Sequence, residues 1–319
     1  MSVDTVGYAA MASLVQVVVL ALGAPILLGV IAKVRARAEG RVGAPVSQPL
    51  RDIRKLMSKE RLRVEYSTLV LALAPTIVLG ATTLAVAISP LATTHPMLSG
   101  SADVFVIVYL LLTGSIALAL GGLDTATAFG GMGSSRAITI GALAEPALLV
   151  AVVALSIQAG SSNLPAIVTT TLSHPVWAST PTRLLALVAL VIVIIAESGR
   201  LPVDNPSSHL ELTMIHEAMV LEYSGSDLGQ VTLAAAMRLG LFLSLLASLF
   251  VPWGIATGTS YLALLLGVIF LALKTSVLAV GIALIEVHSA KLRLFRVPEL
   301  LAGGFVLAVL AVITDLATR

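Results

Sequence analysis

The chain has 319 residues, of which 58% are hydrophobic and 11% are charged, and its mean hydropathy is +1.03. Soluble globular domains carry about 25% charged residues, so the composition excludes an ordinary soluble protein and indicates several membrane spans. The net charge is only +2, so the positions of the charges are more informative than their sum.

Cysteine is absent from the sequence. Its absence excludes disulfides, thiolate nucleophiles, Cys-ligated zinc and iron–sulfur clusters bound by this chain. Any redox cofactor of that kind must therefore lie in another chain. No polar linker divides the apolar segments, so residues 1–319 are predicted to form a single polytopic membrane domain.

Eight apolar segments are each close to the ~20 residues that a membrane-spanning helix needs. They are residues 11–33, 67–89, 103–122, 137–158, 182–197, 231–252, 261–286 and 299–316. The first is interpreted as a span and not as a signal peptide, because no basic segment precedes it and no small-residue cleavage site follows. The predicted fold is an all-α integral membrane protein with eight transmembrane helices.

Lysine and arginine are concentrated in alternate loops. The loop 33–66 holds ten of them, and Arg136, Arg200, Lys291, Arg293 and Arg296 lie in later loops of the same parity. The loops and the chain end on the other side contain only Arg183 and Arg319. Such a bias predicts that the basic loops are cytoplasmic and that both termini lie outside the cytoplasm.

The first long loop contains an amphipathic segment that follows a turn rich in glycine and proline. Its apolar residues recur at three- and four-residue spacing, and its basic residues lie away from that stripe; the two sets are Leu50, Ile53, Leu56 and Met57, and Arg51, Arg54, Lys55 and Lys59. The pattern predicts an interfacial helix that contacts anionic lipid, docks a soluble partner, or does both. The predicted docking residues are Arg41, Arg51, Arg54, Lys55, Arg293 and Arg296.

A glycine-rich stretch, Phe129 to Arg136, superficially resembles a phosphate-binding loop. No strand precedes it and no Walker lysine follows it, which argues against nucleotide binding. Residues 123–136 are therefore expected to form a flexible cytoplasmic loop in which the glycines allow close backbone approach. Residues 90–102 and 159–181 are expected to be plain external connectors.

Glu145 is the clearest acidic residue within a predicted span, and Pro146 follows it directly. Proline removes a backbone hydrogen bond and kinks the helix, which leaves a carbonyl that needs a partner or water. A carboxyl group beside such a kink favours a proton relay, although a neutral acid that is hydrogen-bonded within the bundle would also satisfy the pattern.

Other charged residues also fall within or near the predicted spans. Lys274 and Arg238 can pair with acidic groups, and such a set either moves protons or holds helices together. Glu286 and Asp315 lie near span ends and are expected to be interfacial.

The densest charge follows the fifth span, in the stretch from Glu197 to Gly225. Gly199, Pro202 and Pro206 prevent a continuous helix, so a broken helix–loop–helix is expected, with its second helix beginning near Ser208.

On that second helix, Glu211 and Glu222 would share one face about 16 Å apart, and His209 and His216 would share another. Glu211 also fits a capping box with Ser208, which would explain it without any further role. The two faces predict a polar cavity at the cytoplasmic side.

The same stretch offers side chains that could ligate a metal, namely His209, His216, Glu217 and Glu222. The second histidine of a zincin motif is missing, and no paired Glu-x-x-His repeat occurs. Neither a metal site nor a catalytic triad is therefore predicted.

Four long motifs together carry a family resemblance. They are Glu39 to Leu56, Gly130 to Pro146, Ala196 to Gly225 and Lys291 to Leu301. In this order they resemble the membrane subunit that respiratory complex I shares with the energy-converting NiFe hydrogenases. The amino-acid sequence from Arg200 to Pro206 is most similar to that of the formate hydrogenlyase branch.

The resemblance implies an eight-helix subunit in the cytoplasmic membrane of a prokaryote. It would link a hydrophilic arm, carrying NiFe and iron–sulfur centres or a dehydrogenase, to antiporter-like proton-translocating subunits. Nucleic acid is not an expected partner. The acids of the lateral proton path would match Glu145, Glu211 and Glu222. Independently of the resemblance, the charges of Lys274 and Arg238 within the spans make them further candidates for this path.

The loop that shapes the quinone cavity of complex I would match Arg200, Pro202 and Asp204, with Glu197 and His209 beside them. This chain departs from complex I there, with Val203, Ser207 and His209 in place of the usual residues. A quinone-binding subunit is thus the alternative function. A stand-alone secondary transporter is a second alternative, although no internal repeat supports it.

Overall fold

The structure is a computed structural model that describes residues 3–62, 64–65, 67–174, 180–204 and 214–318, with side chains from Thr5 onward. Within these ranges its regular elements are all helices, with no strands. They are α1 (Val3–Ala38), α2 (Gln48–Met57), α3 (Leu69–Ile88), η1 (Ser99–Ser101), α4 (Val104–Asp124), α5 (Ala128–Ala159), α6 (Leu164–Ser173), α7 (Pro181–Glu197), α8 (His216–Val220), α9 (Gly225–Phe250), α10 (Tyr261–His288), η4 (Leu294–Arg296) and α11 (Val297–Thr318).

Seven helices in the described ranges are long and apolar enough to cross a membrane, namely α1, α3, α4, α5, α9, α10 and the helix that ends at Thr318. The remaining predicted span, the fifth (182–197), corresponds to α7, whose 17 residues match the lower limit of spanning helices. The all-α membrane fold is therefore confirmed, while the count of eight is not. The connector expected over 159–181 contains a short helix, α6.

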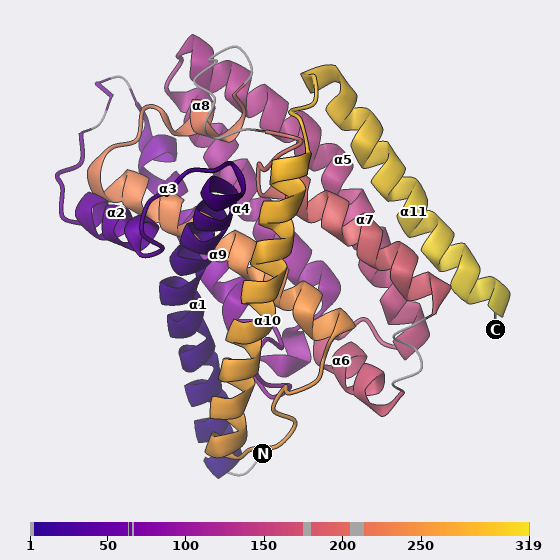
Figure 1. Cartoon of the computed structure of the whole chain (residues 1–319). Coiled ribbons are helices and arrows are strands. Elements are labelled where there is room, and N and C mark those ends of the chain that lie inside the picture. The colour runs from indigo at the N-terminus through magenta and orange to yellow at the C-terminus, as the bar shows by residue number, and fades with distance from the viewer. Residues whose placement is uncertain (1–2, 63, 66, 175–179, 205–213, 319) are drawn as a thin grey trace.

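The long helices form one bundle in which neighbours in sequence are mostly neighbours in space (Figure 1). Helix α9 is the most buried span and packs against α1, α3 and α10, while α5 packs against α4, α7 and α11. Helices α2 and α8 lie at one end, and α1 begins and α11 ends at the other. Both chain ends thus lie opposite α2 and α8.

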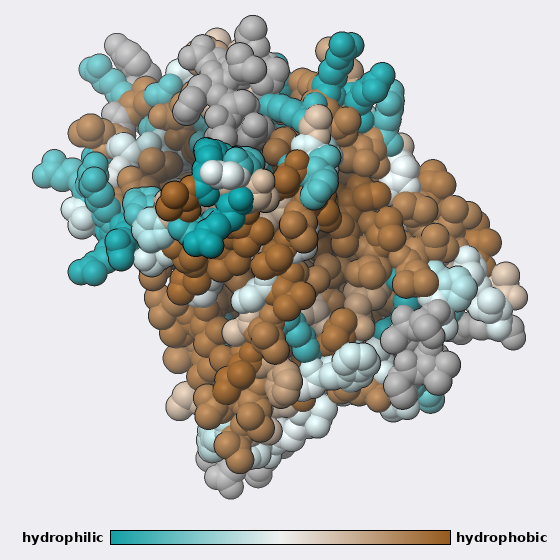
Figure 2. Space-filling view, viewed as in Figure 1, coloured by the Kyte–Doolittle hydropathy of each residue, from teal (hydrophilic) through white to brown (hydrophobic). Residues whose placement is uncertain are grey.

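Polar side chains gather at the end that carries α2, α8 and η4, whereas the flank of the bundle that faces the viewer is mostly hydrophobic (Figure 2). We call this end the basic end, because the loops 39–68, 198–204 and 289–296 bring most of the lysine and arginine there. The exposed side chains on the flanks include Leu73, Leu120, Leu265, Leu273 and Ile313. A hydrophobic belt below a polar cap is the surface that a lipid bilayer requires.

Helix α2 confirms that the predicted amphipathic segment is helical. Its apolar face buries Ile53 and packs on α1 and α9, while its basic side chains are exposed. The segment that follows is fixed to the start of α9, since the amide of Leu62 donates to Ser224 at 2.7 Å and the Ser224 hydroxyl donates back to the Leu62 carbonyl at 2.9 Å. Gly225 has φ +52°, and a Cβ there would lie 2.0 Å from the Glu60 carbonyl oxygen.

The glycine-rich stretch is helical, so the prediction of a loop over 123–136 is wrong. Helix α5 begins at Ala128, nine residues before the predicted span, and Thr127 caps it by accepting from the Gly130 amide. The predicted close approach is present: a Cβ at Gly130 would lie 2.4 Å from the Gly122 carbonyl oxygen. Packing against α4 and α8 therefore outweighs the low helix propensity of glycine.

At the end opposite to the basic end, the segments between the helices have irregular backbone. Side chains form hydrogen bonds with the amides and carbonyls of these segments. Gln16 Oε1 accepts from the amides of Leu91 and Ala92 at 3.2 and 2.9 Å. Lys274, midway along α10, donates to the carbonyls of Val251 and Trp253. Such partners are needed because non-helical backbone at membrane depth cannot bond to lipid.

Arg183 is buried at the same end, with 1% of its surface exposed. It donates to Gln158 Oε1 at 2.8 Å, to the Leu249 carbonyl at 3.2 Å and to Thr171 Oγ1 at 2.5 Å. These acceptors lie at the last turns of α5, α9 and α6. Helix C-termini carry partial negative charge, so they offset the buried cation.

Candidate functional site

A cavity of about 390 Å³ lies inside the bundle toward the basic end; most of its wall is apolar, and we call it the polar cavity for the polar and charged side chains that reach it. Helices α3, α4, α5, α7, α8 and α9 contribute to its wall. Its polar side chains are Thr82, Ser115, Glu145, Glu197, Ser198, His216, Glu217, Thr232 and Arg238. Three acids, one histidine and one arginine around a space of this size can hold water and exchange protons.

The break after α7 creates the upper wall of the cavity. Helix α7 ends at Glu197, and Gly199 then turns the chain with φ +58°. A Cβ at Gly199 would lie 2.4 Å from His216 Cδ2, so only glycine lets the imidazole pack against this turn. The predicted break after the fifth span is confirmed, and α8 follows it as a single short turn of helix.

Glu197 and Arg238 form an ion pair across the cavity, from the end of α7 to the middle of α9. Arg238 also donates to Ser115 Oγ at 2.6 Å and lies 5.7 Å from the centre of the Phe242 ring. The Nε of Arg238 is buried and has no hydrogen-bond partner among the described groups. A buried pair of this kind is stable only while both partners remain.

Glu145 lines the same cavity from α5 and is half-buried there. Its carboxyl group interacts electrostatically with both Glu197 and Arg238. Pro146 follows it within the helix, so the backbone at this turn lacks one hydrogen bond. The structure thus places Glu145 beside a fixed ion pair and open space.

His216 lines the cavity at the start of α8. Desolvation lowers the pKa of its imidazole, and nearby Arg238 adds to this effect, while Asp204 and Glu197 act in the opposite direction. Its Nδ1 is buried and has no hydrogen-bond partner in the described part of the chain.

Above His216, two segments at the basic end are held together by Asp204. Asp204 is 3% exposed, and its carboxylate pairs with Lys291 Nζ at 3.2 Å and accepts from the Ile215 amide at 3.2 Å. The Leu292 amide also donates to the Pro202 carbonyl at 2.9 Å. The loop after α7 is therefore fixed to the loop after α10.

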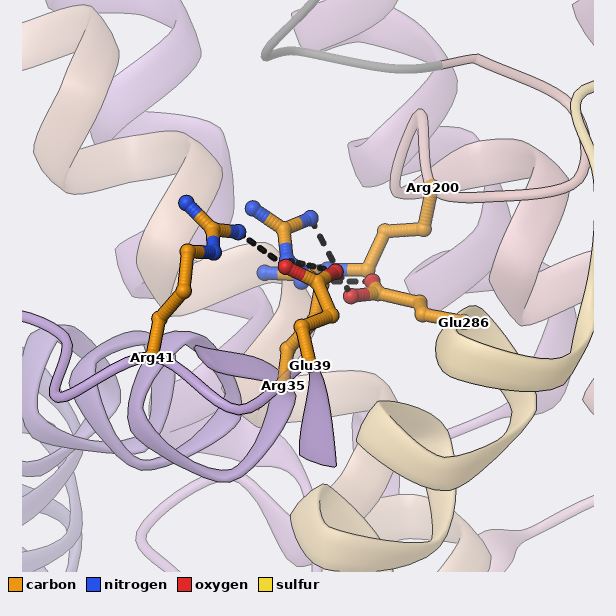
Figure 3. Close-up of polar contacts among 5 residues, drawn as sticks. All are labelled: Arg35, Glu39, Arg41, Arg200 and Glu286. Atoms are coloured by element: carbon orange, nitrogen blue, oxygen red, sulfur yellow. Dashed lines mark hydrogen bonds and ion pairs between the residues drawn. The ribbon is translucent and has the colours of Figure 1, made fainter. Parts of the chain in front are cut away.

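Figure 3 shows a second charged cluster at the basic end, built from Arg35, Glu39, Arg41, Arg200 and Glu286. Glu286 Oε1 pairs with Arg200 Nη1 at 2.8 Å, and its Oε2 lies 3.6 Å from Arg35 Nη1. Glu39 lies 4.0 Å from Arg35 Nε and pairs with Arg41, and the hydrogen bond from Arg41 lowers the pKa of Glu39. Glu286 is 4% exposed, so these arginines pair with a carboxylate that the protein buries near the end of α10.

Beyond Glu145 and Arg238, on the side away from the basic end, the interior of the bundle is apolar. A smaller pocket of about 40 Å³ follows there, lined by aliphatic side chains and Phe242 alone. On each of the shared helices α4, α5, α7 and α9, the residues around this pocket lie farther from the basic end than those around the polar cavity. The polar cavity thus ends at a dry barrier.

The structure brings only part of the predicted set together. Glu145, Glu197 and Arg238 line the cavity, whereas Arg200 and Asp204 are paired with Glu286 and Lys291 above it. Lys274 lies toward the opposite end, bound to two carbonyls. Glu222 is in the turn between α8 and α9 and does not line the cavity. Glu211, Ser208 and His209 lie outside the described residues.

The predicted docking residues are all exposed at the basic end, namely Arg41, Arg51, Arg54, Lys55, Arg293 and Arg296. Phe295 lies between the last two in sequence and is 90% exposed. Among the described residues, no group of three metal-ligating side chains comes together.

Sequence reasoning did not find Ser115, Lys291 or Arg35 as members of these networks. Their partners are distant in sequence: Arg238 Nη1 reaches Ser115, Lys291 reaches Asp204, and Arg35 reaches Glu286. His216 had a detectable signal, since it lies in a dense charged stretch, but its neighbours could not be deduced from spacing.

Comparisons with known proteins agree with this architecture. The chain is 33% identical to formate hydrogenlyase subunit 4 of Escherichia coli (strain K12), over 95% of this chain and 98% of that protein. It is 31% identical to hydrogenase-4 component C of the same organism, over 96% of this chain and 95% of that protein.

A chain of the membrane-bound sulfane sulfur reductase, described as an archaeal respiratory membrane complex, has the same fold. The TM-score is 0.83 with 20% identity, over 95% of this chain and 98% of that one. The profile of the family described as NADH dehydrogenase matches residues 11–316. Because that match spans nearly the whole chain, this multi-pass membrane protein belongs to the NADH dehydrogenase family, and the predicted family resemblance is confirmed.

Proposed function

We propose that this chain is the membrane-anchor and proton-path subunit of a formate hydrogenlyase or membrane-bound NiFe hydrogenase type of oxidoreductase complex. It would link a hydrophilic redox arm to antiporter-like proton-translocating subunits. The observation that carries the proposal is the polar cavity, in which Glu145 lies beside the Glu197–Arg238 pair. The near full-length similarity to two Escherichia coli subunits of such complexes supports it.

The cavity is suited to receive protons from the basic end only. Glu217 and His216 line it next to the paired loops that hold Asp204 and Lys291. The barrier around Phe242 separates it from the opposite end, and an apolar space without polar partners does not hold water. Protons that reach Glu145 would therefore leave sideways, toward a neighbouring subunit, and not straight across this chain.

Redox chemistry would take place in partner chains. This chain has no cysteine and would bind no redox cofactor itself. The contribution of this chain would be electrostatic. A change of charge in a hydrophilic partner at the basic end would act on the ion pairs of Glu286 and Asp204, and these pairs fix the loops above the cavity. A displacement of these loops would change the electric field at Glu197 and Glu145.

Isolation of the native complex tests this assignment. A tag on the chain should co-purify hydrophilic subunits with iron–sulfur or NiFe centres together with antiporter-like membrane subunits. Identification of the co-purifying chains by mass spectrometry and metal analysis provides the measurement. Recovery of the tagged chain alone, in a mild detergent that preserves known respiratory complexes, would instead indicate a stand-alone transporter.

The orientation can be measured directly because the natural chain lacks cysteine. We propose that the basic end faces the cytoplasm. Ser58→Cys and Ser101→Cys place matched, exposed thiols at opposite ends of the bundle. A membrane-impermeant maleimide should label Ser101→Cys in intact cells and Ser58→Cys only in inverted vesicles. The reverse pattern would contradict the proposed topology.

A further inference from the structure

His216 occupies the position between the charged loops and the acids of the cavity. It lines the cavity, and the next residue toward the loops, Ile215, binds Asp204 through its amide. Gly199 packs against the ring so closely that a Cβ there would lie 2.4 Å from His216 Cδ2. The imidazole is therefore held in one place, beneath the Asp204–Lys291 pair and beside the Glu197–Arg238 pair.

The open atom of this residue is Nδ1, which is buried without a hydrogen-bond partner in the described ranges. Buried polar atoms are nearly always bonded to protein or water, and the polar cavity beside this one provides room for water. A neutral imidazole carries one nitrogen that accepts a proton and one that donates a proton. The ring can thus take up a proton at Nδ1 and release one from its other nitrogen when the hydrogen bond between that nitrogen and the Glu197 backbone opens.

Charged groups face His216 from each element around it. Glu197 comes from the end of α7, Asp204 from the loop after it, and Arg238 from α9. Glu217 follows it on α8, and Arg136 of α5 donates to the Met214 carbonyl at 3.1 Å. Burial and Arg238 favour the neutral ring, and the two carboxylates stabilise the protonated ring while it exists. The imidazole of His216 can therefore gain and lose a proton, because its surroundings stabilise both the neutral and the protonated form.

We propose that His216 is the proton-relay residue between the loops at the basic end and the carboxylates of the cavity. In the first step the neutral ring accepts a proton from a hydronium ion and leaves water. In the second step the imidazolium gives a proton, directly or through cavity water, to the carboxylate of Glu145 or Glu197 and becomes neutral again. This inference rests on the proposed proton path and assigns a second residue to it.

The test uses the complete complex in inverted vesicles. His216→Gln should slow proton uptake coupled to turnover by about tenfold, less than the loss of an obligatory acid–base group, because cavity water provides a partial bypass. His288→Gln is the matched control, since among the residues that the structure describes this exposed histidine is bonded only to the Leu284 carbonyl of its own helix. It should leave uptake unchanged.

Chemical rescue separates proton transfer from packing. His216→Ala leaves space for a small ring, so added imidazole should restore uptake, whereas pyrazole, of similar size but much weaker basicity, should not. Equal rescue by both compounds would overturn the relay and indicate a packing role, as would normal uptake in His216→Gln. If Glu145→Gln abolishes uptake while His216→Gln does not, only the relay fails; if both variants retain uptake, the proposed function fails as well.

Discussion

Glu145→Gln is expected to abolish proton translocation while the complex still assembles. Glutamine keeps the size and polarity of the side chain but cannot carry a proton, and removal of a positioned proton-transfer group lowers such rates by about 100-fold or more. Because Glu145 is only half-buried and is not the partner of Arg238 in the ion pair, the substitution should not disturb the fold. Turnover-driven acidification in inverted vesicles measures the effect.

A conservative exchange on the surface provides the control for that variant. Glu299→Gln removes an exposed carboxylate from the first turn of α11 and should leave acidification unchanged. Glu222→Gln tests whether the proton path extends beyond the cavity, because Glu222 was predicted for the path but does not line the cavity. Full acidification by Glu145→Gln vesicles with normal subunit content would disprove its role.

The second large effect concerns the ion pair of Glu197 and Arg238. Arg238→Met should destabilise the protein by about 3–5 kcal/mol, because it leaves the carboxylate of Glu197 buried without its partner. The two side chains are 8% and 17% exposed, so solvent screens the pair weakly. Thermal unfolding of the detergent-solubilised complex, followed by loss of its assembled form, measures the change.

The double variant Glu197→Gln, Arg238→Met distinguishes the pair from its individual members. With neither charge buried, most of the lost stability should return, since a buried pair contributes little net stability compared with neutral replacements. A double variant that is as unstable as the sum of its single variants would show that the two charges do not interact. Proton translocation should remain impaired even where stability returns.

Hydropathy alone predicted the positions of the spans well, because the bilayer demands about 20 apolar residues for each helix. It failed at α5, where glycines indicated a loop. Tertiary packing decides the outcome there: Gly130 and Gly133 allow α4 and α8 to approach so closely that a Cβ would collide with the Gly122 carbonyl and the Ala218 side chain. Composition within one segment carries no information about such neighbours.

The candidate site was predictable where a local rule applied. A carboxyl group followed by proline within a span identified Glu145, and the run of Gly199 and Pro202 identified the break. Glu222 was placed by assuming a continuous helix from Ser208, but α8 ends at Val220, which moves Glu222 into a turn. The pairing of Arg238 with Glu197 joins residues 41 positions apart, and no periodicity within a helix encodes a contact of that range.

The protonation state of Glu145 is the most direct test of the proton path. Redox-induced infrared difference spectra of the complex report carboxyl groups that gain or lose a proton during turnover. We expect a carboxylic acid C=O band that is present in the natural protein and in Glu299→Gln but missing from Glu145→Gln. Identical spectra for the natural protein and Glu145→Gln would show that Glu145 does not change its protonation state during turnover, and would contradict its role in the path.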